Sequence, residues 1–146
     1  MPKQVISFRV ELGFDQWLAQ VDQGLVKVVD KTLDNVLIAS EARVPKKTTA
    51  TQRSHYKVTE NGSGAEEAMA DARSVKPEVQ FAGEQDPVPR HLQGFAIVST
   101  DYAAALEYGG GSSKTGDIPY FTPSVDEQDE PFIKACNEVI SSAKGL

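Results

Sequence analysis

Cysteine is almost absent from this sequence, in which Cys136 is the single cysteine among 146 residues. One cysteine cannot close a disulfide within the chain or build a cysteine-rich zinc site, so neither cross-link supports the fold. Long apolar runs are also absent: no stretch approaches the roughly 20 residues of a membrane span, and the first residues lack the apolar core of a signal peptide. We therefore expect an intracellular protein that is neither exported nor bound to a membrane.

Positive charge is in short supply as well. The chain carries 15 Lys and Arg residues against 21 Asp and Glu residues, which gives a net charge of −6. This balance argues against non-specific binding to the phosphate backbones of nucleic acids.

Histidine is scarce, and neither His55 nor His91 has a His, Cys or carboxylate neighbour at metal-ligand spacing. We predict that both histidines are exposed in loops. Ser54 precedes His55 without the surroundings of a nucleophile elbow, and Cys136 is predicted to be a small core residue. The sequence thus predicts no catalytic group, no metal site and no cofactor.

The chain is rich in periodic apolar patterns. Residues 4–12 alternate in a way that predicts a strand, with Ile6, Phe8, Val10 and Leu12 on one face. From about Asp15 to Val44, apolar residues recur at steps of three and four, which predicts one amphipathic helix about 45 Å long. Gly24 marks a bend or a break in it. We expect the following members of its stripe to face the sheet: Trp17, Leu18, Val21, Leu25, Val28 and Leu37.

The remaining segments complete an α+β fold in a single domain, residues 1–146. Residues 45–93 are predicted to be a variable loop or insertion within it, holding one short helix at 64–73. A strand at 95–100 is predicted to pair with residues 4–12, and a brief helix at 102–108 ends at a glycine run. The fold class is therefore a long amphipathic helix packed on a small antiparallel sheet, with a C-terminal helix and a long central loop or insertion.

Three charged or glycine-rich stretches have simple interpretations. YGGGSSKTG at 108–116 lacks the two glycines that a P-loop needs, because Ser113 and Tyr108 stand there, so it is predicted to be a flexible loop. The acids of 126–130 are predicted to form a solvated helix start. The basic residues of 46–57 are predicted to form a solvated or subunit-contacting loop.

Three segments together resemble a family of phage proteins. They are ASEARVPKKTT at 39–49, DYAAALEYGG at 101–110 and IPYFTPSVDEQDEPFIKACNEVI at 118–140. Their order is similar to that in the small neck and tail-completion proteins of tailed bacteriophages, also described as head-to-tail joining or minor capsid proteins. Tyr102, Ala103, Glu107 and Gly109 match the Y-A-x-x-x-E-x-G motif of that family.

The resemblance implies a structural virion protein and not an enzyme. Such proteins form a homo-oligomeric ring at the neck that joins or completes the head-to-tail connection and contacts neighbouring connector and tail proteins. DNA passes through the lumen without sequence-specific binding, and no membrane or cofactor is involved. The ring would assemble in the host cytoplasm and end in the neck or tail region of the virion.

The same resemblance leads to a hypothesis about how subunits meet. The basic loop of one protomer is predicted to face the acidic helix start of the next, as a head-to-tail ring contact requires two complementary surfaces on each chain. The residues assigned to this subunit interface are Lys46, Lys47, Arg53, Tyr102, Glu107, Tyr108, Tyr120, Phe121, Asp126 and Glu127.

Other functions stay open at the level of sequence. Within the same class, the chain could be a tail terminator ring that caps the tail tube. A small phage hydrolase or nuclease would need a cluster of His, Asp or Glu side chains. A host-factor binding module would use the middle segment as its recognition surface.

Overall fold

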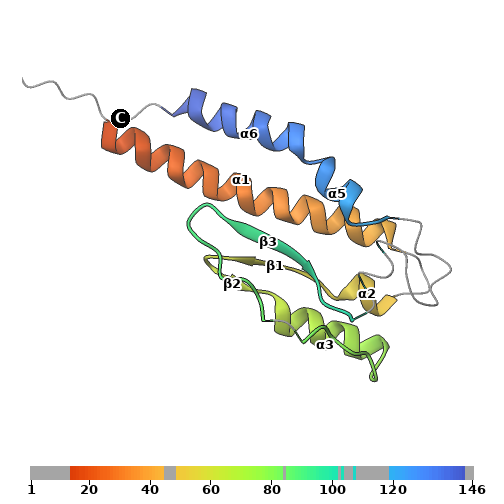
Figure 1. Cartoon of the computed structure of the whole chain (residues 1–146). Coiled ribbons are helices and arrows are strands. Elements are labelled where there is room, and N and C mark those ends of the chain that lie inside the picture. Colours follow the sequence, from red (N-terminus) through yellow and green to blue (C-terminus); the bar gives the residue numbers. More distant parts are fainter. Residues whose placement is uncertain are drawn as a thin grey trace, which may run out of the picture.

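The computed structural model describes residues 14–44, 49–83, 85–101, 103, 107 and 119–143 of the chain. Its longest element is helix α1, Phe14–Arg43, which continues through Gly24 without a break (Figure 1). Asp15 lies in the first turn and Arg43 in the last, so each charge is at the end of the helix dipole that favours it. The long helix predicted from apolar periodicity is confirmed.

Three antiparallel strands form the sheet, in the order β2-β1-β3. Strands β1 (His55–Thr59) and β2 (Gly62–Ser63) form a hairpin, and Gly62 adopts a φ of 138° that side-chain-bearing residues rarely take. Strand β3 (Gly94–Val98) pairs with β1 along its whole length. The strand predicted at 95–100 is confirmed, whereas its predicted partner, residues 4–12, lies outside the described residues.

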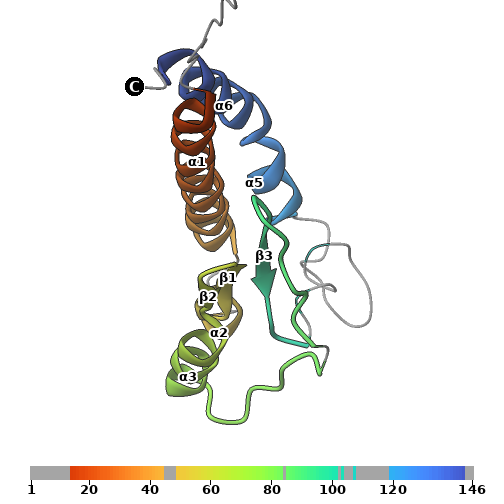
Figure 2. The same cartoon turned by 90° about the vertical axis from the view of Figure 1, so that its left-hand side faces the viewer.

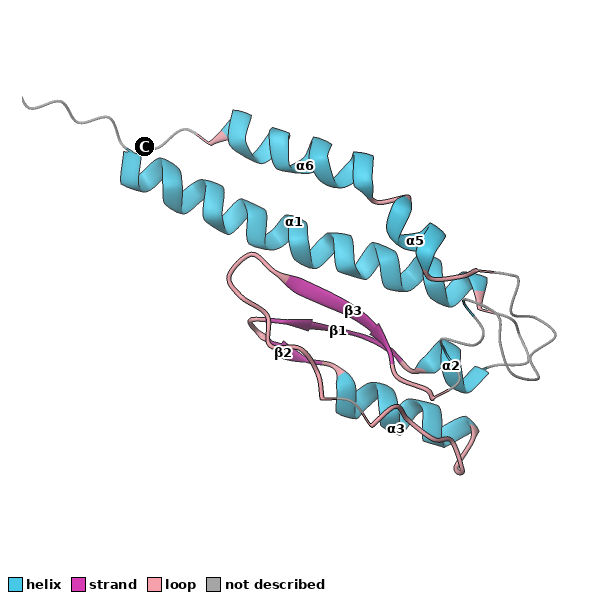
Figure 3. Ribbon diagram, in the orientation of Figure 1, coloured by secondary structure: helices cyan, strands magenta, loops and turns pink. Residues whose placement is uncertain are grey.

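Helices cover both faces of this sheet (Figure 3). On one face, Lys57 of β1 reaches Asp34 of α1, with its Nζ 2.8 Å from the carboxylate. On the other, Tyr56 and Val58 pack with Ala68 of helix α3 (Ala65–Val75). Alternation along one short strand therefore joins the long helix to the central part of the chain.

The C-terminal part of the chain packs against α1. Helix α5 (Thr122–Asp126) is followed by helix α6 (Asp129–Ser142), and both lie on the β3 side of α1 (Figure 2). The predicted C-terminal helix is confirmed. Pro131 is the third residue of α6, where a missing N–H costs no helix hydrogen bond. None of the described helices is both long and apolar enough to cross a membrane.

The central segment 45–93 contains more regular structure than the predicted loop or insertion. It holds helix α2 (Thr49–Arg53), both strands of the hairpin, and α3, which confirms the short helix predicted at 64–73. From sequence, the surroundings of Lys57 are interpreted as a basic loop. The acids of α1 balance that charge and allow β1 to pack under the helix.

The apolar stripe of α1 is only partly covered by the sheet. The helix has 30 residues, whereas β1 and β3 have five each, so the start of α1 extends past the strands (Figure 1). The prediction that Trp17 and Leu18 face the sheet is therefore wrong. Trp17 stacks on Phe14, with ring centroids 5.9 Å apart, and Leu18 is 44% exposed.

Gly24 lies where α1 and α6 approach each other closely. A Cβ built on Gly24 would lie 2.5 Å from Cγ1 of Val139, closer than real Cβ atoms come to other carbons. The glycine is thus explained by close packing of two helices and not by a bend.

Replacing Gly24 with alanine is expected to destabilise the fold by about 1–3 kcal/mol, even though alanine favours helix by about 1 kcal/mol. The β-branched Val139 cannot rotate away easily, so the helices must separate. Combining Gly24→Ala with Val139→Ala should recover part of this loss, because the second truncation makes room. Thermal unfolding checks both variants. A single variant that melts at or above the wild-type temperature would show that the close approach is not limiting.

Candidate functional site

A network of polar side chains lies where the end of α1, the start of β1 and the start of α5 meet. We call it the junction. It draws residues from each of the segments 39–49, 101–110 and 118–140. Its members are the side chains of Ser40, Arg43, His55, Glu107, Tyr120 and Ser124, together with the backbone carbonyl of Ala103.

Glu107 is the main acceptor of the junction and is only 7% exposed. Its Oε2 accepts the N–H groups of Tyr120 and Phe121 at 2.8 Å, and its Oε1 accepts that of Thr122 at 2.7 Å. These donors stand at the start of α5, where a helix leaves N–H groups unpaired. Burial alone would raise the pKa of Glu107, but the hydrogen bonds outweigh it and hold the pKa below its ordinary value. Glu107 therefore fixes the path of the chain into α5.

Tyr120 fills the apolar side of the junction and is 1% exposed. Its hydroxyl donates to the carbonyl of Ala103 at 2.9 Å, while its ring packs with Val44. The ring also meets the edge of His55, with centroids 6.1 Å apart. The tyrosine thus joins the end of α1, the first residue of β1 and the segment around Ala103.

Arg43 ties the last turn of α1 to α5. Its Nη1 donates to Ser124 Oγ at 2.8 Å, and its guanidinium pairs with the carboxylate of Glu127. Ser124 in turn donates its hydroxyl to the carbonyl of Tyr120 at 2.6 Å. Because Ser124 is fully buried, this chain of bonds satisfies a hydroxyl that would otherwise destabilise the interior.

His55 is buried, at 7% exposure, which corrects the prediction of an exposed loop histidine. Its Nδ1 lies 2.9 Å from the carbonyl oxygen of Thr51, and its Nε2 lies 2.6 Å from Ser40 Oγ. A carbonyl can only accept, so Nδ1 carries the proton and Nε2 accepts from the serine hydroxyl. The strand pairing of β1 and the cover provided by α1 account for the burial.

The Ser40 and His55 pair has the distance of a nucleophile and its base but not the access. Ser40 has no exposed surface, and the His55 ring is enclosed by Tyr120 and α1. Burial lowers the pKa of His55 and outweighs the hydrogen bonds to the Thr51 and Gln52 carbonyls, which raise it. The neutral imidazole acts here as a hydrogen-bonding part of the interior.

Comparison with models of known protein families, with curated proteins and with solved structures finds no match for this chain.

Stability is expected to fall as the pH drops below about 6.5, the ordinary pKa of histidine, because the unfolded chain then binds a proton that buried His55 resists. The contribution of His91 to the pH dependence of stability has the opposite sign. Hydrogen bonds to Asp22 and Glu60 raise the pKa of His91, so its stabilising effect is lost as the pH rises through that raised value. Chemical denaturation from pH 5 to 8 should show that the free energy of unfolding of His55→Gln falls less at acid pH than that of the wild type. The control variant His91→Gln should still lose stability at acid pH. An unchanged pH profile in His55→Gln would contradict the assignment.

The residues assigned to the subunit interface do not form one surface patch among the described residues. Lys46, Lys47, Tyr102 and Tyr108 lie outside the described residues. Glu107 and Tyr120 are buried inside the protomer as members of the junction, where they form hydrogen bonds to other residues of the same chain.

The other members lie nearer the surface. Phe121 is half-buried beside β3, and Asp126 is exposed on α5. Arg53 pairs with Asp71 of α3, at 3.0 Å, and Glu127 pairs with Arg43. Two of the charges expected to meet across subunits thus have partners within one protomer.

Ser40, Arg43 and Ser124 are not predicted as functional residues from sequence, although all three stand inside the quoted segments. Their one signal is position: Ser40 and Arg43 stand four and seven residues after Val36, at positions where the apolar stripe of α1 would continue. Ser124 has no such signal, because α5 is only five residues long. Their partners lie between 15 and 81 positions away in the chain, which no local pattern reveals.

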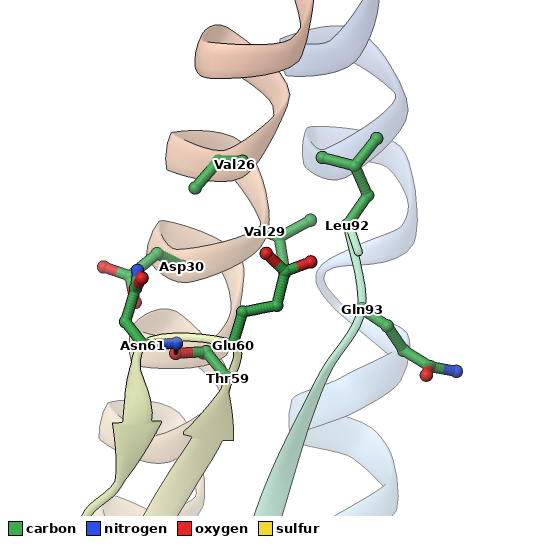
Figure 4. Close-up of a pocket in the computed structure, with 8 residues that line it drawn as sticks. All are labelled: Val26, Val29, Asp30, Thr59, Glu60, Asn61, Leu92 and Gln93. Carbon is green, nitrogen blue, oxygen red and sulfur yellow. Dashed lines mark hydrogen bonds between the residues drawn. The ribbon is translucent and has the colours of Figure 1, made fainter. Parts of the chain in front are cut away.

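Two hollows outside the junction are lined by both polar and apolar residues. A cavity of about 30 Å³ lies between α1, the β1–β2 turn and the segment before β3, with Val29, Glu60 and Leu92 in its lining (Figure 4). Its size suits a single water molecule. A wider cleft of about 510 Å³ along the outer side of β1 is lined by charged residues that include Glu41, Lys57 and Asp71. No group of three or more His, Cys, Asp or Glu side chains among the described residues has metal-binding geometry.

Proposed function

We propose that this chain is a structural virion protein of a tailed bacteriophage, which forms a homo-oligomeric ring at the neck and joins or completes the head-to-tail connection. The junction is the observation that carries the proposal. Side chains from three phage-like segments hold one another in a buried network, as when Arg43 donates to Ser124, 81 residues later. A shared physical role for these distant residues supports the resemblance.

The roles of the motif residues support a structural function. Glu107, the acid of the Y-A-x-x-x-E-x-G motif, uses its oxygens to bind backbone N–H groups of the same chain. Tyr120 donates its hydroxyl to a backbone carbonyl. These contacts position α5 and the segment before it, and in the proposed function the chain catalyses no reaction and needs no cofactor.

Apolar side chains on the helix surfaces also support an assembly role. Ile133 and Ile140 of α6 are 59% and 44% exposed and stand seven positions apart, which places them on one face of the helix. Ile38 of α1 is 66% exposed. Apolar surface of this kind favours burial against another protein, and a ring subunit needs two such surfaces.

The test is the oligomeric state of the purified full chain and its place in the virion. Mass photometry should give a particle of several times 15.8 kDa, and negative-stain electron microscopy should show rings with a central hole. Antibodies against the chain should label the neck of virions of the phage that encodes it. A protein that stays monomeric at all concentrations and is missing from purified virions would contradict the proposal.

A further inference from the structure

The outer edge of β3 has no strand partner among the described residues, because β3 ends the strand order β2-β1-β3. The N–H of Ser99, which follows β3, donates to Ser54 on the β1 side at 3.3 Å. Successive residues of a strand direct their backbone groups to opposite sides. Ala96 and Val98 therefore direct their N–H and C=O groups to the outer edge, where they can bind another strand.

An apolar groove runs along this edge. It consists of two hollows of about 410 and 270 Å³ that share Ala96 and Phe121 in their linings. Leu33 of α1 and Val125 of α5 form walls of the larger hollow. Figure 2 shows α5 and α6 on this side of α1, so the groove lies between the sheet edge and the C-terminal helices. We name it the β3 groove.

Building on the proposed ring, we infer that residues 4–12 of a neighbouring copy add as a strand to the outer edge of β3. This segment lies outside the described residues, and its sequence alternates with Ile6, Phe8, Val10 and Leu12 on one face. The backbone of an added strand would bind the outward groups of β3, and its apolar face would fill the β3 groove. The polar residues of the alternation, such as Ser7 and Arg9, would face solvent.

The same segment of the same chain is too far away. Gly94 at the start of β3 packs at the level of Leu33, because a Cβ there would touch Leu33 Cδ1. From Phe14 to Leu33 the helix is about 28 Å long at 1.5 Å per residue. A fully extended chain returning from Phe14 covers about 26–29 Å by residue 6, at about 3.3–3.6 Å per residue, and about 20–22 Å by residue 8. Within one chain Ile6 therefore reaches at most the start of β3, whereas Phe8, Val10 and Leu12 fall short of it, so a second copy must supply the apolar face of the strand.

The β3 groove also suits this strand better than the other hollows do. The cleft on the outer side of β1 is lined by Glu41, Lys57 and Asp71, whose charges oppose burial of apolar side chains. The second long stretch outside the described residues, 108–118, is mostly Gly and Ser and has no alternating apolar face. Addition of a strand from copy to copy is a head-to-tail contact, which is the kind that closes a ring.

The experiment uses two kinds of full-length variant. Phe8→Asp with Val10→Asp removes the apolar face of the donated strand. Ala96→Pro removes one outward N–H of β3 without touching the pairing with β1, and Val125→Lys charges the groove wall as an independent second variant. Each is expected to weaken self-association by roughly a hundredfold or more. The matched control, Val5→Asp with Ser7→Asp, adds the same charge to the opposite face of residues 4–12 and should assemble like the wild type.

Mixing the variants separates exchange between copies from docking of the segment on its own chain. A strand-defective chain still has an open groove, and a groove-defective chain still has an intact strand. Equal amounts of the two should therefore form a 1:1 dimer in sedimentation velocity that neither forms alone.

Two outcomes would overturn the inference. If the strand and groove variants form rings like the wild type, the contact lies elsewhere and the proposed function still stands. If the strand variant melts at a lower temperature and the mixture yields no dimer, the segment docks on its own chain. A wild-type chain that never forms rings would instead contradict the proposed function.

Discussion

Replacing Glu107 with alanine is expected to lower the free energy of unfolding by about 3–5 kcal/mol, one of the largest effects of any single change in this chain. The variant removes the acceptor of three backbone N–H groups at residues 120–122. Buried donors without an acceptor cost more than the hydrogen bonds themselves contribute, because they have also lost their water. Urea denaturation followed by circular dichroism measures the loss.

Two control variants sharpen this result. Glu107→Gln keeps one acceptor oxygen and should lose less than half as much. Glu138→Ala removes an exposed acid from α6 and should change stability by no more than about 0.5 kcal/mol. The Glu107 effect should also shrink as the pH falls through the ordinary carboxyl range, because its depressed pKa stabilises the fold only while the group is ionised. An alanine variant with the wild-type urea midpoint would contradict the capping role.

Replacing Tyr120 with alanine is expected to cost about 3–5 kcal/mol, in this case from a cavity in the interior. The ring is 1% exposed and packs with Val44, Val98 and Phe121. Tyr120→Phe separates packing from hydrogen bonding, since it loses only the bond to the Ala103 carbonyl and should cost about 1 kcal/mol. Thermal melts of Tyr120→Ala and Tyr120→Phe compare the two losses of stability. A phenylalanine variant as unstable as the alanine variant would show that the ring itself contributes little.

The helices of this fold can be predicted from the sequence because the apolar patterns that indicate them are local. The stripe of α1 and the apolar spacing of α6 repeat within a few residues, so both predictions are confirmed. Strand β1 cannot be predicted from a local pattern in the same way. Lys57 makes the segment look like a solvated basic loop, and only the acids Asp30 and Asp34, more than 20 residues earlier, explain why it is half-buried.

The junction is less predictable for the same reason. The segments 101–110 and 118–140 contain Glu107 and Tyr120, but the subunit-interface hypothesis places both at a subunit surface. Their actual contacts join residue 107 to residues 120–122 and residue 120 to Ala103, which depends on how the chain turns between them. His55 is similar: the sequence contains no sign that Ser40 lies 2.6 Å from its ring.

The position of α1 at the beginning of the fold has a consequence for synthesis. The helix is complete when the ribosome has added residue 43, but α6, which packs on it, ends at residue 142. At 5–20 residues per second, the intervening residues take roughly 5–20 s to make. Until α6 has been made, the part of the apolar stripe of α1 that α6 covers is exposed to water or bound by a chaperone. The protomer therefore completes its fold only after α6 leaves the ribosome, and the nascent chain passes through a period of aggregation risk.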